Sequence, residues 1–122
     1  MVFAINPGPG QFETFKAAAT GAATPTTGTP ATPSTTAAAK DIKVVVGGPG
    51  VLAFNPPNVQ ANIGDRIIFE FHQKNHSVVA STFENPCVPL SGGFASPYFP
   101  VTDADTVFPT YSVTVNSVST AF

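Results

Sequence analysis

The sequence predicts an all-β sandwich, and three observations favour this fold class. The 122 residues include 11 Phe but no Trp, and Phe, Val and Thr dominate the stretches that look ordered, as is typical of strands. These stretches are short and are separated by turns, consistent with the 13 Pro and 10 Gly of the chain. In the segment 66–72, apolar residues recur at every second position. Several short strands separated in this way are typical of a two-sheet sandwich.

The first nineteen residues predict one strand and one helix. Residues 1–6 are mostly apolar and end at the Pro-Gly-Pro-Gly sequence of 7–10, so we expect a short strand there. Residues 11–19 predict a short helix, because Phe12 and Phe15 fall on one helical face. A helix of this length is marginal in isolation, so it needs a packing partner.

Residues 20–40 consist almost entirely of Thr, Ala, Pro, Gly and Ser. Such a segment buries too little apolar surface to offset the entropy of ordering, so we expect a disordered linker. Its Thr and Pro content is also typical, on composition alone, of an O-glycosylated stalk.

Residues 41–122 form the main predicted β region. Its clearest strand is 66–72, in which Ile67, Phe69 and Phe71 face one way. The alternate residues, Ile68, Glu70 and His72, face the other way. Further strands are expected at 42–46, 51–54, 76–83 and 111–115, with the start of another at 119–122; turns are expected at 47–50, 62–65 and 73–75, and a loop at 84–109.

Composition excludes several classes of function. Only 10% of the residues are charged, the five Lys and Arg are scattered, and the net charge is −2, so the sequence does not predict a nucleic-acid partner. No apolar stretch is long enough for a transmembrane helix, and residues 1–7 do not resemble a signal peptide. No nucleophile elbow, HExxH helix or phosphate-binding loop is present, so we expect no enzyme. We interpret Asp103 and Asp105 as solvated loop residues rather than an acid–base pair or a calcium site.

An ordered set of motifs resembles a known family. The set begins with Leu52-x-Phe54-x-Pro56 and continues through Gly64-Asp65-x-Ile67-x-Phe69-x-Phe71 and Asn75-His76-Ser77-Val78. It ends with Asn85-Pro86-Cys87, Phe99-Pro100-Val101 and Tyr111-x-Val113-x-Val115-Asn116. Over residues 41–122 the chain thereby resembles the fungal extracellular, serine-rich cupredoxin-like proteins, which are related to plant phytocyanins. The resemblance implies a Greek-key β-sandwich and a secreted protein.

The first nineteen residues resemble the other end of the same family. Its members finish with Cys-x4-His-Cys-x2-Gly-Met, then Val-Phe-Ala-Ile-Asn-Pro and a short helix, and residues 1–19 match from that Met onward. The resemblance therefore implies the end of one cupredoxin domain (1–19), a linker (20–40), and most of a second domain (41–122) that stops before its metal loop. The parts also have the order of a circular permutant. We predict that strand 1–6 completes the sandwich beside the late strand at 111–117.

The resemblance also assigns candidate metal ligands. Blue-copper sites use two His, one Cys thiolate and a weak axial ligand, often Met. His76 corresponds to the first His ligand and Met1 to the axial position, whereas the ligand Cys and the second His would lie past Phe122. Copper is thus the cofactor of the parent family, and this chain is expected to bind it weakly or not at all. Cys87 corresponds to a disulfide Cys whose partner is absent from the chain, so a free, partly buried thiol is expected.

Two functions remain open on the sequence. The first is a copper-binding, electron-transfer module with an incomplete site, and the alternative is a metal-free structural or interaction module of the fungal cell surface or wall. His72 lies four residues before His76 and is interpreted as a solvated strand residue, with a weak two-His metal site as the alternative. Asn75-His76-Ser77 matches the N-glycosylation pattern. Without the metal loop, we expect an apolar surface to be exposed at that end of the sandwich, which favours self-association. The sequence identifies no redox partner.

Overall fold

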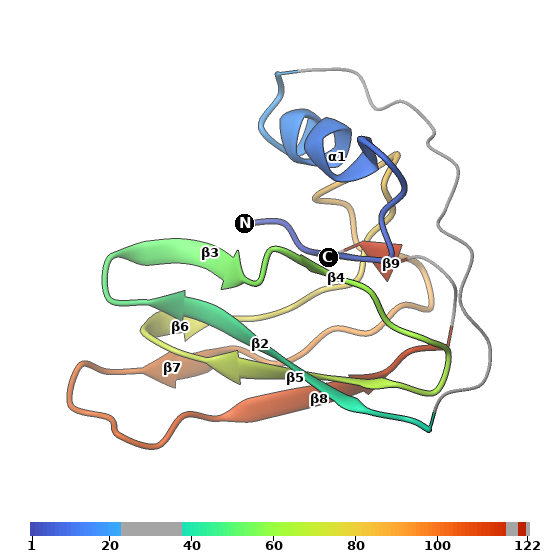
Figure 1. Cartoon of the computed structure of the whole chain (residues 1–122). Coiled ribbons are helices and arrows are strands. Elements are labelled where there is room, and N and C mark those ends of the chain that lie inside the picture. Colours follow the sequence, from blue (N-terminus) through green and yellow to red (C-terminus); the bar gives the residue numbers. More distant parts are fainter. Residues whose placement is uncertain (23–37, 117–119, 122) are drawn as a thin grey trace.

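The computed structural model describes residues 1–22, 38–116 and 120–121, and the fold there is mostly β with one short helix (Figure 1). The expected linker at 20–40 falls largely outside the described residues. The predicted division of the chain into the parts 1–19, 20–40 and 41–122 therefore stays a prediction. The elements are β1 (Ala4–Ile5), α1 (Gln11–Ala19), β2 (Asp41–Gly48), β3 (Val51–Asn55), β4 (Asn58–Val59), β5 (Arg66–Phe71), β6 (Lys74–His76), β7 (Phe99–Val101), β8 (Thr110–Thr114) and β9 (Thr120–Ala121).

The described strands form three sheets. The largest has the order β3-β2-β5-β8, in which β2 runs parallel to β5 and the other two pairs are antiparallel. A second sheet has the order β4-β1-β9, with β1 parallel to β4 and antiparallel to β9. The third is the antiparallel pair β6-β7. Figure 1 shows α1 on the far side of the β4-β1-β9 sheet from the four-stranded sheet.

One apolar core joins the sheets. The predicted inward face of β5 is confirmed, because Ile67, Phe69 and Phe71 are fully buried. Phe3, which precedes β1, packs edge-on against Phe69 with ring centroids 5.5 Å apart, and it also contacts Phe54 of β3 at 5.4 Å. Burial of large aromatic side chains is the main stabilising term in a small domain of this kind. The N-terminal segment therefore contributes directly to the core of the main β region.

The predicted helix is confirmed over Gln11–Ala19, and it has the packing partner that its length requires. Phe15 is 1% exposed and packs against Phe83 of a distant loop, with ring centroids 5.2 Å apart. The Gln11 side chain accepts a hydrogen bond from the backbone N–H of Gly8 at 2.8 Å. Tertiary packing thus stabilises a helix whose intrinsic propensity is marginal.

Asn6 connects the N-terminal strand to the main β region. Its side-chain amide donates to the carbonyl of Ala61 at 2.6 Å and accepts from the N–H of Ala61 at 2.8 Å. Its backbone N–H donates to the carbonyl of Val59 at 2.9 Å. Asn6 is 3% exposed, so these bonds lie in the interior and extend the β1–β4 pairing by one residue. The expected strand at 1–6 is therefore present, with its regular part confined to β1.

Asp65 organises the turn before β5. Its carboxylate accepts from the N–H of Asn62 at 2.8 Å and from the N–H of Lys40 at 3.0 Å, and the residue is 1% exposed. The bond from Asn62, followed by that from Lys40, lowers the pKa of Asp65 below its usual range. The carboxylate thus ties the turn at 62–65, which was predicted, to the entry of β2.

The predicted neighbour of the N-terminal strand was wrong. We expected residues 1–6 beside 111–117, but β1 lies between β4 and β9, and β8 pairs with β5 instead. The apolar pattern of 1–6 indicates a buried strand but carries no information on its neighbours. The pairing is set by long-range contacts, such as those of Asn6, that sequence periodicity does not reveal.

Four segments also differ from the sequence predictions. The expected turn at 73–75 overlaps β6, and the expected loop at 84–109 contains β7, because these two short segments pair with each other. Of the expected strand at 76–83, His76 belongs to β6, and the rest makes isolated bridges, including Val79 to Ala95, in place of a continuous strand. The glycines at 47 and 48 belong to β2, so the turn is shorter than expected.

Candidate functional site

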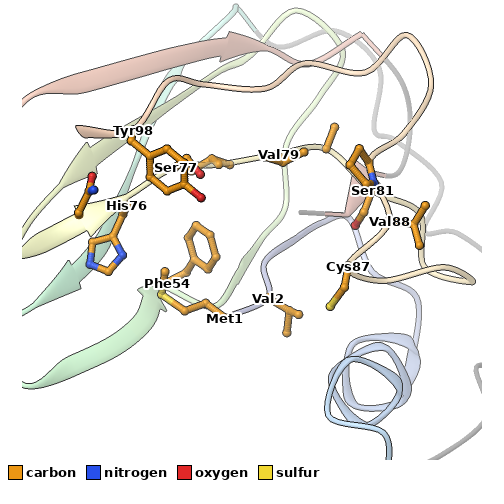
Figure 2. A pocket seen from close by; sticks show the side chains of 14 residues that line it. Met1, Val2, Phe54, His76, Ser77, Val79, Ser81, Cys87, Val88 and Tyr98 are labelled. Carbon is orange, nitrogen blue, oxygen red and sulfur yellow. The ribbon is translucent and has the colours of Figure 1, made fainter. Parts of the chain in front are cut away.

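A cavity of about 410 Å³ brings together all three residues that the sequence singled out, Met1, His76 and Cys87 (Figure 2). It lies where the N-terminal segment passes the end of β3, β6 and the loops that follow β6. In Figure 2, His76, Met1, Phe54 and Tyr98 lie towards one end, whereas Ser81, Cys87 and Val88 lie towards the other. The remaining lining residues are Val2, Asn75, Ser77, Val78, Val79, Ala80 and Pro89.

His76 is 7% exposed, and its ring is positioned by backbone groups of the preceding residues. Nε2 lies 3.1 Å from the carbonyl oxygen of Gln73 and 3.1 Å from the backbone nitrogen of Lys74. Both contacts use Nε2, which leaves Nδ1 without a protein partner among the described residues. When the proton is on Nε2, that nitrogen donates to the Gln73 carbonyl, and the Nδ1 lone pair is free to bind a ligand.

Gly47 makes room for this imidazole. A Cβ atom at position 47 would lie 2.2 Å from Nε2 and 2.6 Å from Cδ2 of His76. The backbone φ of Gly47 is also +77°, in the region that favours glycine. The glycine pair that the sequence analysis interpreted as a turn therefore has a second role, which is to let the His76 ring lie against β2.

Met1 lies at the His76 end of the cavity, next to Phe54 (Figure 2). It is 51% exposed. The structure therefore places a thioether and an imidazole, from the two ends of the cupredoxin-like pattern, at one cavity. Their roles as axial and first copper ligands stay predictions.

Cys87 lies at the opposite end of the cavity and is a free cysteine. Its side chain is exposed, so the expectation of a partly buried thiol was wrong. The exposure follows from its position in the turn after Asn85, outside any strand of the described chain. The disulfide role inferred from the family resemblance stays a prediction.

His72 does not line this cavity, and it is not the solvated strand residue that we expected, because it follows the end of β5 and is half-buried. Its Nε2 lies 2.8 Å from a carboxylate oxygen of Glu70, and its ring stacks on Phe108 with centroids 3.8 Å apart. The other carboxylate oxygen of Glu70 pairs with Lys43 at 2.5 Å. The bond from Lys43, followed by that from His72, lowers the pKa of Glu70. These contacts occupy His72 on the outer face of the four-stranded sheet.

The acidic residues Asp103 and Asp105 lie in the loop between β7 and β8. Asp105 accepts hydrogen bonds from the backbone N–H of Thr102 at 2.6 Å and from its hydroxyl at 2.8 Å, and these lower the pKa of Asp105. Asp103 and Asp105 are both exposed, as expected. Over residues 1–22, 38–116 and 120–121, no group of three or more His, Cys, Asp or Glu side chains is arranged to hold a metal ion. No helix in the same ranges is long and apolar enough to cross a membrane.

Sequence reasoning missed Ser81. This residue lines the cavity and is 6% exposed, yet its Oγ has no hydrogen-bond partner among the described residues. By contrast, the hydroxyl of Ser96 accepts from the N–H of Val78 at 2.9 Å and donates to the carbonyl of Pro97. No motif distinguishes these two serines in the sequence. Only the three-dimensional packing shows that one hydroxyl is paired and the other is not.

Comparison with known proteins finds distant, partial similarity to fungal extracellular proteins. The chain is 41% identical over 56 residues to "Extracellular serine-rich protein" of Arthroderma benhamiae, a match that covers 46% of this chain and 22% of that protein. It is 36% identical over 60 residues to "Probable GPI-anchored cupredoxin-1" of the same fungus, covering 49% of this chain and 32% of that protein. The matches thus span less than a third of either relative. No family model and no solved structure matches the chain.

Proposed function

We propose that this chain is an extracellular fungal module of the cupredoxin type, related to copper-binding, electron-transfer proteins, and that its own residues supply an incomplete copper site. The observation that carries this proposal is the meeting of His76 and Met1 at one cavity. These residues come from separate parts of the chain, and a family resemblance assigns both to copper ligation. The similarity to a fungal cupredoxin supports the same assignment.

The nitrogen of His76 and the sulfur of Met1 are of the types that bind copper, but two donors are fewer than a blue-copper site needs. Imidazole and thioether groups are suitable copper ligands. In the tautomer with the proton on Nε2, which then donates to the Gln73 carbonyl, Nδ1 of His76 is free to bind. Copper, when bound, would supply one-electron chemistry. A blue-copper site also needs a thiolate and a second imidazole. Cys87 lies at the other end of the cavity, and His72 is paired with Glu70, so neither supplies the missing ligand.

The fold proposal is that residues 1–19 complete a Greek-key sandwich in circularly permuted order. Two observations support it: β1 lies between β4 and β9, and Phe3 packs into the core of the main β region. In the family pattern these residues correspond to a last strand and a terminal helix. Residues 20–40 would then act as the linker that joins this last strand to the first.

Copper titration of three proteins tests the proposal: the wild type, His76→Ala, and the matched control His72→Ala. We expect weak Cu(II) and Cu(I) binding to the wild type by calorimetry, at least ~tenfold weaker binding to His76→Ala, and unchanged binding to His72→Ala. We expect no intense thiolate-to-copper absorption band, because Cys87 is not a ligand. Equal binding by all three proteins would refute the role of His76, and a thiolate band would refute the assignment of Cys87.

The second candidate is a metal-free structural or interaction module of the fungal cell surface. The Thr-, Ala- and Pro-rich composition of 20–40 favours it, since such segments are typical of surface stalks. The relatives named as extracellular serine-rich and GPI-anchored proteins are consistent with the same location. Absence of any copper binding, together with an intact fold in the same samples, would select this second function.

A further inference from the structure

The Ser81 end of the cavity has a property that metal binding does not explain. Ser81 is almost fully buried, and its Oγ is unpaired within the described part of the chain. A buried hydroxyl without a partner loses its bonds to water and gains nothing in return, so such groups are rare and call for an explanation. In the observed rotamer Oγ has almost no accessible surface, and a rotation about the Cα–Cβ bond would be needed to turn it towards a ligand in the cavity that Ser81 lines.

The rest of the lining restricts the chemistry of that ligand. Most of the lining side chains are apolar, and none of those that the structure describes is Asp, Glu, Lys or Arg. At the Ser81 end, away from the α-amine of Met1, a charged ligand would lose its hydration without gaining an opposite charge from these side chains, so a neutral one is favoured there. The volume of about 410 Å³ lies within the range of about 300–1,000 Å³ that is usual for small-molecule sites.

We propose that this cavity binds a neutral, largely apolar small molecule with one hydrogen-bonding group, of the single-ring phenol type. The ring lies between Val2 and Val88 at the Ser81 end of the cavity, and the phenolic hydroxyl pairs with Oγ of Ser81. An apolar cavity of about 150 Å³ is enough to hold one benzene ring, so the space accommodates a substituted ring. This activity is separate from copper binding, because it needs neither Nδ1 of His76 nor the thioether of Met1.

Cys87 provides a built-in reporter for the test. Its thiol is exposed and lines the same end of the cavity as Ser81 (Figure 2). Cys87 is the one cysteine of the chain, so any thiol alkylation reports on this position. A molecule bound beside Ser81 shields the thiol, and the alkylation rate with iodoacetamide therefore falls as the cavity fills.

The probes are 4-ethylphenol and ethylbenzene, which differ by one hydroxyl group. Both are titrated, in buffer with a chelator and no metal, against the wild type, Ser81→Ala and the control Ser91→Ala, an exposed serine outside the cavity lining. Binding is followed by Cys87 protection and by NMR shifts. We expect wild type and Ser91→Ala to bind 4-ethylphenol about fivefold more tightly than Ser81→Ala does, as loss of one hydrogen bond predicts. Ethylbenzene should bind all three proteins equally.

Two results would overturn the proposal. One is failure of both probes to protect Cys87 or to shift resonances of the lining residues, which would mean that water alone satisfies the Ser81 hydroxyl. The other is an unchanged preference for the phenol in Ser81→Ala. If that variant fails to fold, Val88→Trp replaces it: filling the cavity from this exposed position should abolish binding of both probes, and retained binding would refute the site. Because metal is absent throughout, failure of the copper proposal leaves these outcomes unaffected.

Discussion

The backbone at position 47 requires glycine for two separate reasons. Its φ of +77° disfavours any residue with a Cβ, and an added Cβ would lie 2.2 Å from Nε2 of His76. Gly50 shares the first property, with φ of +70°, but has open space around it. Substituting each glycine in turn therefore distinguishes the cost of backbone strain, which both positions share, from the cost of a clash with His76, which only position 47 has.

We predict that Gly47→Ala destabilises the fold by about 2–4 kcal/mol, whereas Gly50→Ala costs about 1–2 kcal/mol. Both substitutions introduce strain, but only the first forces the His76 ring away from the Gln73 carbonyl. Urea denaturation gives the two free energies of unfolding, and copper titration should show weaker binding in Gly47→Ala alone. Equal losses in both variants would mean that the His76 ring moves aside without cost.

At this scale, the sequence predicted His76 as a candidate ligand but gave no information about its surroundings. The motif Asn75-His76-Ser77-Val78 identified His76 through a family resemblance, and the residue does line the cavity. The requirement for Gly47 and the unpaired hydroxyl of Ser81 arise from contacts between residues distant in the chain. No local pattern encodes such contacts, so sequence reasoning could not find them.

The N-terminal strand is an element that its neighbours hold in place. β1 has two residues, too few to be stable alone, and the paired amide of Asn6 extends its attachment to the segment after β4. Asn6 also has a positive φ of 52°, a conformation that Asn tolerates better than most residues. The side chain of Asn6 therefore extends the strand pairing, while its backbone turns the chain at the end of β1.

We predict that Asn6→Ala lowers the free energy of unfolding by about 2–4 kcal/mol, since both bonding groups of Ala61 lose their buried partners. Amide hydrogens of residues 4–6 should exchange slowly in the wild type and much faster in the variant, as measured by hydrogen exchange with mass spectrometry. Asn85→Ala, in an exposed turn, serves as the control and should behave like the wild type. Fast exchange of 4–6 already in the wild type would contradict the integration of this strand.

Sequence periodicity predicted the elements whose burial is regular. In β5 every second residue is buried and the others are half-buried or exposed, and α1 places Phe15 against the fold, so both were found with nearly correct bounds. β6 and β7 have three residues each and no apolar alternation. They form because they pair with each other across the sequence from 74 to 101, and a pattern-based prediction has no signal for such strands.

At the scale of the whole molecule, the core is built from both sides of the linker. Phe3 is fully buried between Phe54 and Phe69, and Phe15 packs on Phe83. Residues 1–19 thus belong physically to the same unit as 41–116, although low-complexity sequence separates them.

We predict that the two parts stay together after the connection is cut. A specific protease site inserted between Gly28 and Thr29 allows cleavage of the folded protein, and the products should co-elute at micromolar concentration on size-exclusion chromatography. The same protein with Phe3→Asp should separate after cleavage, because burying an unpaired carboxylate opposes docking. Dissociation of the unsubstituted fragments would show that residues 1–19 depend on the linker for their position.

The position of β1 between β4 and β9 also has a consequence for assemblies of several copies. A segment that docks through its own strand pairing and apolar side chains can be donated to the same groove of a neighbouring molecule, as in donor-strand exchange. In the open form of this exchange, each copy would give its first strand to the next copy and receive one from the copy before it. The product would be a linear oligomer. Where copies are crowded on one surface, such exchange converts a set of separate modules into a mechanically continuous layer.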